Sequence, residues 1–158
     1  MIIVDIVSKS KKWKSSENFI TETCEKLIPL TDLKKVLKKN ITIELSISLV
    51  LDPEMKKINF NFRQKDKVTN VLSFPAQESF SGKSDYVFLG DIIIAFNHIQ
   101  KESLAQNKTF ENHLTHLILH SILHLIGFDH EDDKDAKIME SLEIKILKKL
   151  KIPNPYLL

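Results

Sequence analysis

One segment, HSILHLIGFDH at positions 120–130, constrains the fold more strongly than any other part of the chain. It completes a run, 110–126, whose leucines and isoleucines cover most of the circumference of a helix, which is typical of a buried helix. His120 and His124 are one turn apart on that helix, so their rings point the same way. Gly127 suits the turn that ends a helix, and the reversed chain returns His130 toward the same point. The sequence therefore predicts three imidazoles that meet at the end of a buried helix.

Three neutral imidazoles at one point are a donor set for a metal ion. Zn²⁺ binds imidazole nitrogen at about 2.0–2.1 Å, and a catalytic zinc site keeps its fourth position for water. The spacing is that of the metzincin peptidases, H-E-x-x-H-x-x-G-x-x-H, except that Ser121 stands where those enzymes have a glutamate base. We therefore expect one Zn²⁺ held by His120, His124, His130 and a water, in a chain that lacks the peptidase base.

Other side chains near this segment have an alternative role in packing. His113 and His116 lie on nearly the same stripe of the helix as the first of the three histidines. His116 could support the site or contact a substrate, or it could simply pack beside the site. Asp129 could orient a ligand ring or cap the turn. Cys24 and Met139 fit apolar helix positions, so we expect both in the core rather than at the metal.

Strand patterns and helix patterns are interspersed along the chain. Residues 41–51 alternate almost strictly between apolar and polar side chains, which predicts a strand with one polar face. Further strands are expected at 2–7, 70–75 and 87–96, a loop at 78–86, and helices at 15–28, 31–39, 52–62, 98–106, 110–126 and 132–150. Met55, Ile58 and Phe62 are expected to point inward from the helix that begins at Asp52-Pro53. No repeat or linker divides residues 1–158, so we expect a single α/β (α+β) domain with a small mixed sheet packed against several helices.

Composition bears on location and on partners. The single cysteine excludes an internal disulfide. The opening residues have their positive charges after the apolar run, whereas a signal peptide has them before it. No apolar stretch approaches the roughly 20 residues that span a bilayer. We therefore expect a cytoplasmic protein with no membrane partner. Residues 1–67 hold 14 basic and 9 acidic side chains, which is compatible with nucleic acid but equally with lysines that solvate helices.

The segment at 120–130 resembles the motif of the YbeY family of bacterial endoribonucleases, H-G-x-L-H-L-x-G-[YF]-D-H, with Ser121 at the glycine position. FRQKDKVTNVLSFP (62–75), LGDIIIA (89–95) and EDDKDAKIMESLE (131–143) are similar to further family signatures. The resemblance implies a zinc-dependent, single-strand-specific endoribonuclease. It would mature the 3′ end of small-subunit ribosomal RNA and act in ribosome quality control. The implied partners are ribosomal RNA and the ribosome or its proteins, with no DNA expected. His120, His124 and His130 match the metal ligands of the family, and Arg63 matches an arginine held to matter for activity.

Arg63 is informative apart from the resemblance, because it is the only arginine among 23 basic residues. A planar guanidinium binds phosphate through two donors in a way that lysine cannot copy, although an ordinary surface arginine is an equal alternative. Lys65 and Lys67 would attract phosphate at longer range. We hypothesise that zinc activates water or a ribose 2′-hydroxyl while Arg63 stabilises the charge that develops on the phosphoryl group.

Two other functions are compatible with the same residues. One is a zinc peptidase whose base, Glu111 or Asp91, is supplied by the fold. The other is a non-catalytic ribosome-associated protein whose zinc is structural. Aromatic side chains do not decide between them, because Phe74, Phe80 and Phe128 could lie in the core or stack on bases.

Overall fold

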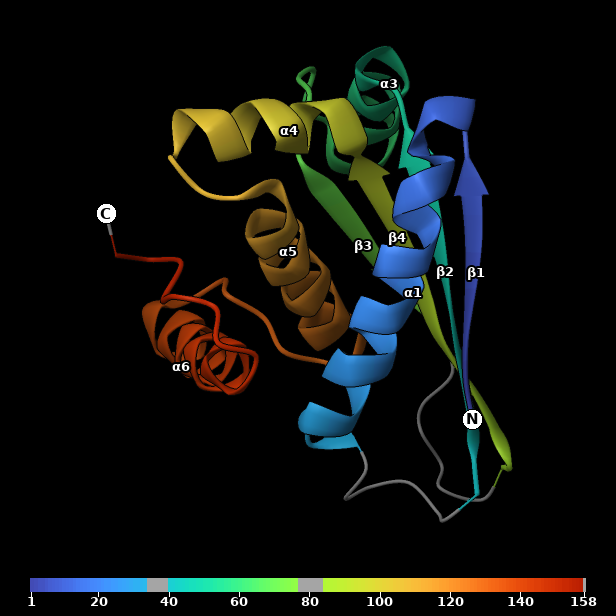
Figure 1. Cartoon of the computed structure of the whole chain (residues 1–158), viewed down its shortest axis with the longest axis vertical. Coiled ribbons are helices and arrows are strands. Elements are labelled where there is room, and N and C mark those ends of the chain that lie inside the picture. Colours follow the sequence, from blue (N-terminus) through green and yellow to red (C-terminus); the bar gives the residue numbers. More distant parts are fainter. Residues whose placement is uncertain (34–39, 77–83, 158) are drawn as a thin grey trace.

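A four-stranded mixed sheet lies at the centre of the computed structural model, which describes residues 1–33, 40–76 and 84–157 (Figure 1). The strands are β1 (Ile2–Ser8), β2 (Thr42–Val50), β3 (Val71–Pro75) and β4 (Tyr86–Ala95). Their spatial order is β1-β2-β4-β3, with β1, β2 and β4 parallel and β3 antiparallel to β4. β3 therefore forms one edge of the sheet.

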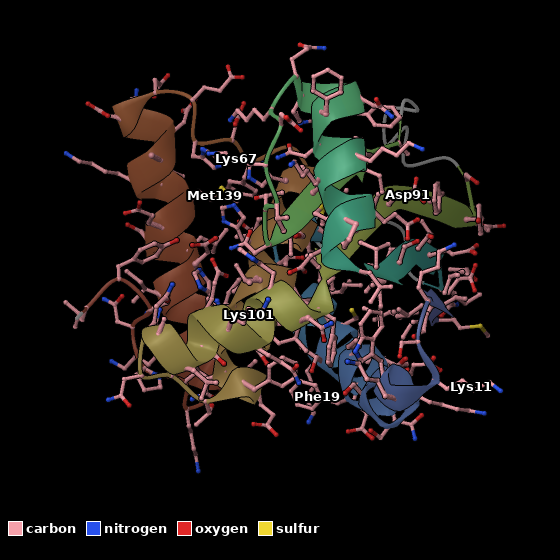
Figure 2. The ribbon with its side chains drawn as sticks, turned by 90° about the horizontal axis from the view of Figure 1, so that it is seen from above. Lys11, Phe19, Lys67, Asp91, Lys101 and Met139 are labelled. Atoms are coloured by element: carbon pink, nitrogen blue, oxygen red, sulfur yellow. The ribbon has the colours of Figure 1, made fainter. Side chains whose placement is uncertain are left out.

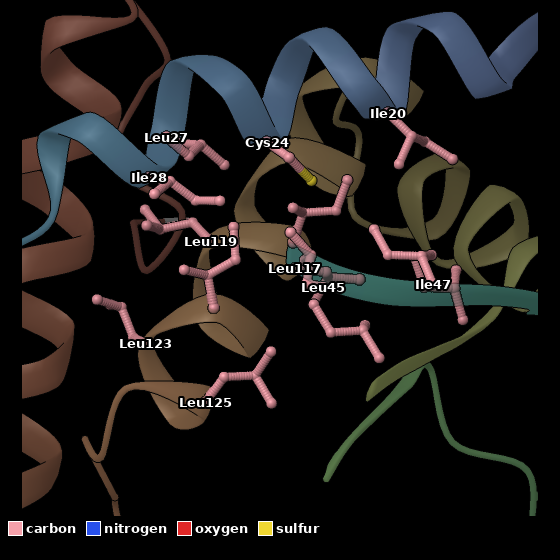
Figure 3. Packing of buried hydrophobic residues seen from close by; sticks show 14 of the residues in the cluster. Ile20, Cys24, Leu27, Ile28, Leu45, Ile47, Leu117, Leu119, Leu123 and Leu125 are labelled. Atoms are coloured by element: carbon pink, nitrogen blue, oxygen red, sulfur yellow. The ribbon is translucent and has the colours of Figure 1, made fainter. Parts of the chain in front are cut away.

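The main core lies between the sheet and two helices, α1 (Lys14–Leu27) and α5 (Phe110–Leu125) (Figure 1). Leu45, Ile47 and Leu49 of β2 are fully buried on this face, while the alternate polar residues lie on the other. Ile20 and Cys24 of α1 pack toward them from above (Figure 3). Burial of each such side chain contributes about 1.5–3 kcal/mol, so the alternation of β2 sets which face of the sheet receives the helices.

The remaining helices complete two further layers. α3 (Asp52–Arg63) covers part of the opposite face, where Met55 packs with Val50, Leu72 and Ala95. α4 (Phe96–Ala105) follows β4 directly. α6 (Asp133–Lys149) packs against α5 on the side away from the sheet (Figure 1). Short 3₁₀ turns, Lys11–Trp13 and Ile28–Leu30, flank α1. α5 is thus enclosed between the sheet and α6.

The predicted α/β class and the small mixed sheet are confirmed. The described strands and helices lie within two residues of their predicted bounds, and the largest difference is at α4, which begins two residues earlier at Phe96. The inward position predicted for Phe62 is wrong, because its side chain is 61% exposed. The small core under α3 ends before the last turn of that helix, so Phe62 lies outside it and its ring meets that of Phe74 edge to face, with ring centres 5.3 Å apart. Most of the predicted helix at 31–39 and loop at 78–86 lies outside the described residues. No helix among the described residues is long and apolar enough to cross a membrane.

Candidate metal centre

The local sequence of α5 determines where its histidines point. The helix begins after Thr109, whose hydroxyl accepts a hydrogen bond from the Asn112 amide at 3.1 Å. Its apolar side chains are buried on nearly all sides, and Ser121 is 0% exposed. The helix ends at Leu125, and Gly127 has φ of +108°, a conformation that favours glycine. The turn that follows carries His130 back beside the end of the helix.

The structure brings the three histidines of the motif together, as the spacing predicted. One ring nitrogen from each histidine lies within 4.8 Å of the corresponding nitrogens of the other two. The Nε2 atoms of His120 and His124 are 3.1 Å apart, and the ring of His130 lies 5.4 Å and 4.9 Å from the rings of His120 and His124. A grouping of this kind can hold a metal ion.

The donor set fits a tetrahedral cation. Two imidazole nitrogens bound to one ion at about 2.0–2.1 Å lie roughly 3.3 Å apart, close to the observed 3.1 Å. Two nitrogen lone pairs at that separation repel each other unless a cation or a proton lies between them. Burial, followed by the charges of His120 and His130, lowers the pKa of His124, which favours its neutral, metal-binding form at neutral pH.

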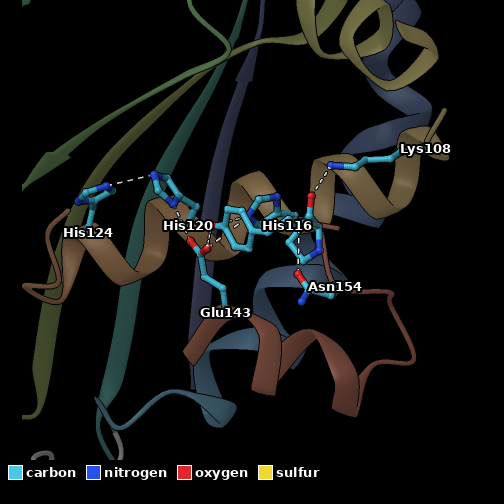
Figure 4. A network of polar contacts seen from close by, with 8 residues as sticks. Lys108, His116, His120, His124, Glu143 and Asn154 are labelled. Carbon is cyan, nitrogen blue, oxygen red and sulfur yellow. Dashed lines mark hydrogen bonds and ion pairs between the residues drawn. The ribbon is translucent and has the colours of Figure 1, made fainter. Parts of the chain in front are cut away.

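A buried carboxylate fixes the orientation of His120. Glu143 of α6 is fully buried, and its Oε1 lies 2.6 Å from His120 Nδ1 (Figure 4). An ionised carboxylate only accepts hydrogen bonds, so Nδ1 must carry the proton and Nε2 is left with its lone pair directed at the other histidines. A carboxylate behind a ligand imidazole is the usual way in which proteins fix the ring and raise its basicity.

Glu143 also has partners on its second oxygen. His116 Nε2 lies 3.3 Å from Glu143 Oε2, and the Tyr156 hydroxyl donates to the same oxygen. Burial raises the pKa of Glu143, but the hydrogen bonds from His116, His120 and Tyr156 outweigh it and lower the pKa to about 2. Glu143 is therefore ionised at neutral pH, and His116 supports the site through this carboxylate.

The histidines open onto a cleft of about 960 Å³. Its lining comes from the end of α5 with the turn that follows it, and from the end of α3, the segment after it and β3. Arg63, Lys65 and Lys67 belong to the second group. The cleft thus holds three imidazoles and three cationic side chains.

Arg63 is the last residue of α3 and lies against the free edge of β3. Its guanidinium donates to the carbonyls of Ser73 at 3.2 Å and Phe62 at 3.3 Å, and its carbon lies 4.9 Å from the centre of the Phe74 ring. A guanidinium has five N–H donors, so most of them remain for a ligand. The structure therefore holds Arg63 in place at the cleft, although its catalytic role stays a prediction.

Several other predicted residues lie away from the cleft. Glu111 is exposed at the start of α5, and Asp91 is exposed on β4, on the other side of α3 from Lys67 (Figure 2). Neither lines the cleft, so neither is placed to act as the base of a peptidase. His113 pairs instead with Glu102 at 3.0 Å.

The packing alternatives are resolved for the remaining residues. Cys24 and Met139 are buried in the core, and burial followed by the charge of Glu25 raises the pKa of Cys24 to about 12. Asp129 caps the turn, because its Oδ1 accepts the His130 amide at 2.7 Å. Phe128 lines the cleft while packing on the core, and Phe80 lies outside the described residues.

Sequence reasoning missed Glu143 and Tyr156. Glu143 carried a signal, because it occupies the stripe of α6 that Met139, Ile146 and Leu147 bury. A charged residue on a buried stripe requires a partner. Tyr156 lies near the end of the chain and no pattern there pointed to the site.

Comparison with known proteins gives a consistent result. The family model described as endoribonuclease YbeY matches residues 5–151. Endoribonuclease YbeY of Bartonella quintana (strain Toulouse) is 41% identical over 156 residues, 99% of this chain and 98% of the relative. Endoribonuclease YbeY of Buchnera aphidicola (subsp. Acyrthosiphon pisum, strain APS) is 46% identical over 128 residues, 80% of this chain and 81% of the relative. The solution structure of TM1509 from Thermotoga maritima is similar with a TM-score of 0.55 and 27% identity, covering 94% of this chain and 92% of that one. The chain therefore belongs to the YbeY family of endoribonucleases.

Proposed function

We propose that this protein is a zinc-dependent endoribonuclease that cleaves single-stranded RNA, with His120, His124 and His130 as the zinc ligands and Arg63 as the phosphate-binding residue. The observation that carries the proposal is the cleft, because a three-imidazole donor set lines it together with Arg63, Lys65 and Lys67. By analogy with the family, the substrate is ribosomal RNA, matured at the 3′ end of the small-subunit RNA and in ribosome quality control. The ribosome or its proteins are the partners, and the cytoplasm is the location.

The division of labour follows from the side chains present. A bound Zn²⁺ supplies Lewis acidity and makes hydroxide available near neutral pH. Glu143 and His116 hold His120 in the required tautomer. Arg63 binds the phosphoryl oxygens, where negative charge accumulates as the bond to the leaving oxygen breaks. Lys65 and Lys67 attract the adjoining phosphates.

A zinc peptidase is the alternative that one specific observation favours. The residue pairing between β3 and β4 leaves the backbone of Ser73 on the outer edge of β3, where its carbonyl already binds Arg63. Such an edge can pair with an extended peptide. However, position 121, where those peptidases have their glutamate base, is a buried serine.

The experiment compares substrates on one preparation. Purified protein is incubated with a single-stranded RNA, its duplex and casein, each with and without a chelator, followed by readdition of Zn²⁺. We expect cleavage of the single strand that the chelator abolishes and Zn²⁺ restores, and we expect the variant His124→Ala to be inactive. Chelator-sensitive cleavage of casein with intact RNA would establish the peptidase, and a metal-binding protein that cleaves neither substrate would establish a structural zinc site.

A further inference from the structure

The C-terminal tail returns to the metal centre after α6 ends. Lys151 has φ of +59°, and the Ile152 amide donates to the carbonyl of Leu147 at 3.0 Å, so the chain turns back at the end of the helix. Further along, Lys108 Nζ donates to the carbonyl of Pro155 at 2.9 Å and ties the tail to the segment before α5 (Figure 4). The tail thereby places Tyr156 at the cleft, which its side chain lines.

Tyr156 reaches the metal centre through one intermediate group. Its hydroxyl donates to Glu143 Oε2, and the other oxygen of that carboxylate accepts the Nδ1 proton of His120. Its ring also contacts His116 edge to face, with ring centres 5.5 Å apart. Tyr156 of the tail therefore contacts the Glu143 carboxylate, and this carboxylate contacts the His120 imidazole, which is a predicted metal ligand.

We propose that Tyr156 is a positioning residue for the metal centre, so that the C-terminal tail sets the affinity of the site for its metal. This inference rests on the proposed metal site, and it concerns a segment beyond residue 151, where the match to the family model ends.

The physical reason is the demand of a buried carboxylate for donors. Glu143 is fully buried, and among the described residues its second oxygen has His116, at 3.3 Å, as its one hydrogen-bond partner besides Tyr156. That bond is long, so Tyr156 is the principal partner of this oxygen. Burial and the hydrogen bond to Glu143 raise the pKa of Tyr156, so the hydroxyl remains a donor throughout the neutral range. Without the hydroxyl, the second oxygen of Glu143 keeps only the long contact with His116 among the described residues, so the carboxylate and with it His120 are held less firmly.

The test is the variant Tyr156→Phe with Tyr86→Phe as matched control. Tyr86 is the only other tyrosine, and its hydroxyl also donates to a carboxylate, that of Glu44, but this hydrogen bond is exposed at the surface of the sheet. Zn²⁺ affinity is measured by competition with a chromogenic chelator, and the absorption spectrum of bound Co²⁺ reports the geometry. Because partners behind a ligand typically contribute 10–100-fold, we expect Tyr156→Phe to weaken Zn²⁺ binding about 3- to 10-fold and to change the Co²⁺ spectrum. Tyr86→Phe should change neither.

Phenylalanine keeps the ring contact with His116, so a role in packing alone would leave affinity and spectrum as in the wild type and overturn the proposal. A second variant, Lys108→Met, removes the hydrogen bond that ties the tail at Pro155 while leaving the residues of the carboxylate network themselves unchanged, and it should also weaken Zn²⁺ binding. Wild-type affinity in both variants would show that the tail is not part of the site. Failure of the proposed function looks different from failure of this inference: in the first case the wild-type protein itself binds no stoichiometric Zn²⁺ or Co²⁺, and in the second it binds the metal and the variants bind it equally well.

Discussion

Replacement of Glu143 by glutamine tests whether the buried carboxylate, rather than the three histidines alone, makes the site. Glutamine has the same shape, but it removes the charge and turns one acceptor into a donor. The amide oxygen can still accept from His120 Nδ1, but the amide nitrogen then meets the proton donors of His116 and Tyr156. We expect Glu143→Gln to weaken Zn²⁺ binding by about 10- to 100-fold, equivalent to roughly 1.4–2.8 kcal/mol.

The same substitution has a consequence for the metal-free protein. A carboxyl group whose pKa falls from 4.5 to about 2 on folding stabilises the folded state by at most about 3 kcal/mol at neutral pH. Because the folded value is the lower one, this stabilisation is complete above pH 4.5 and is lost as the pH falls toward 2. The difference in unfolding free energy between wild type and Glu143→Gln should therefore be constant from pH 7 to 5 and then shrink, by about 1 kcal/mol at pH 3.5.

The assay combines chelator competition at neutral pH with urea unfolding of the metal-free proteins between pH 3.5 and 7. Glu140→Gln is the matched control, because Glu140 is exposed on the same helix and the substitution removes the same charge. Wild-type Zn²⁺ affinity in Glu143→Gln, or a stability difference that does not depend on pH, would refute the reasoning.

Three other substitutions or treatments test separate parts of the structure. Arg63→Lys should lower the turnover of single-stranded RNA by about 10- to 100-fold with unchanged Zn²⁺ affinity, and unchanged turnover would exclude the bidentate role. Gly90→Ala should lower the free energy of unfolding in urea by about 2–4 kcal/mol, because Gly90 has φ of +135° and a Cβ there would lie 2.2 Å from the Phe74 carbonyl oxygen. Gly127→Ala is the control and should lower it less, because nothing lies within 4 Å of a Cβ at that position. Cys24 should resist a thiol reagent at pH 8 until the protein unfolds, since its pKa is raised to about 12; rapid labelling of the native protein would contradict its burial.

The sequence alone predicted those features that depend on residues close together in the chain. His120 and His124 lie on one helix and His130 follows a single turn, so helical spacing and one glycine predicted their meeting. The alternation of residues 41–51 likewise predicted which side chains of β2 enter the core, because a strand has only two faces. In both cases the periodicity of one element determines the result.

The contacts that sequence did not predict join elements far apart in the chain. Glu143 reaches His120 across 23 positions, and Tyr156 reaches His116 across 40. The strand order β1-β2-β4-β3 is of the same kind, because the periodicity of a strand does not specify its neighbour. The error at Phe62 also arose from tertiary structure, since helical spacing cannot show where the apolar surface beneath a helix ends.

The buried position of Ser121 explains why the ligands of a peptidase can occur here without its base. Ser121 is 0% exposed, and its hydroxyl has no hydrogen-bond partner among the described residues. A glutamate at this buried position would place a charge in the core, at a cost of several kcal/mol unless it found a partner. Hydrolysis of a peptide needs a proton shuttle to an amine, and Ser121 cannot supply it. Phosphodiester cleavage depends more on stabilising charge at the phosphoryl oxygens, and Arg63 and two lysines that line the cleft with the histidines are cations suited to that task.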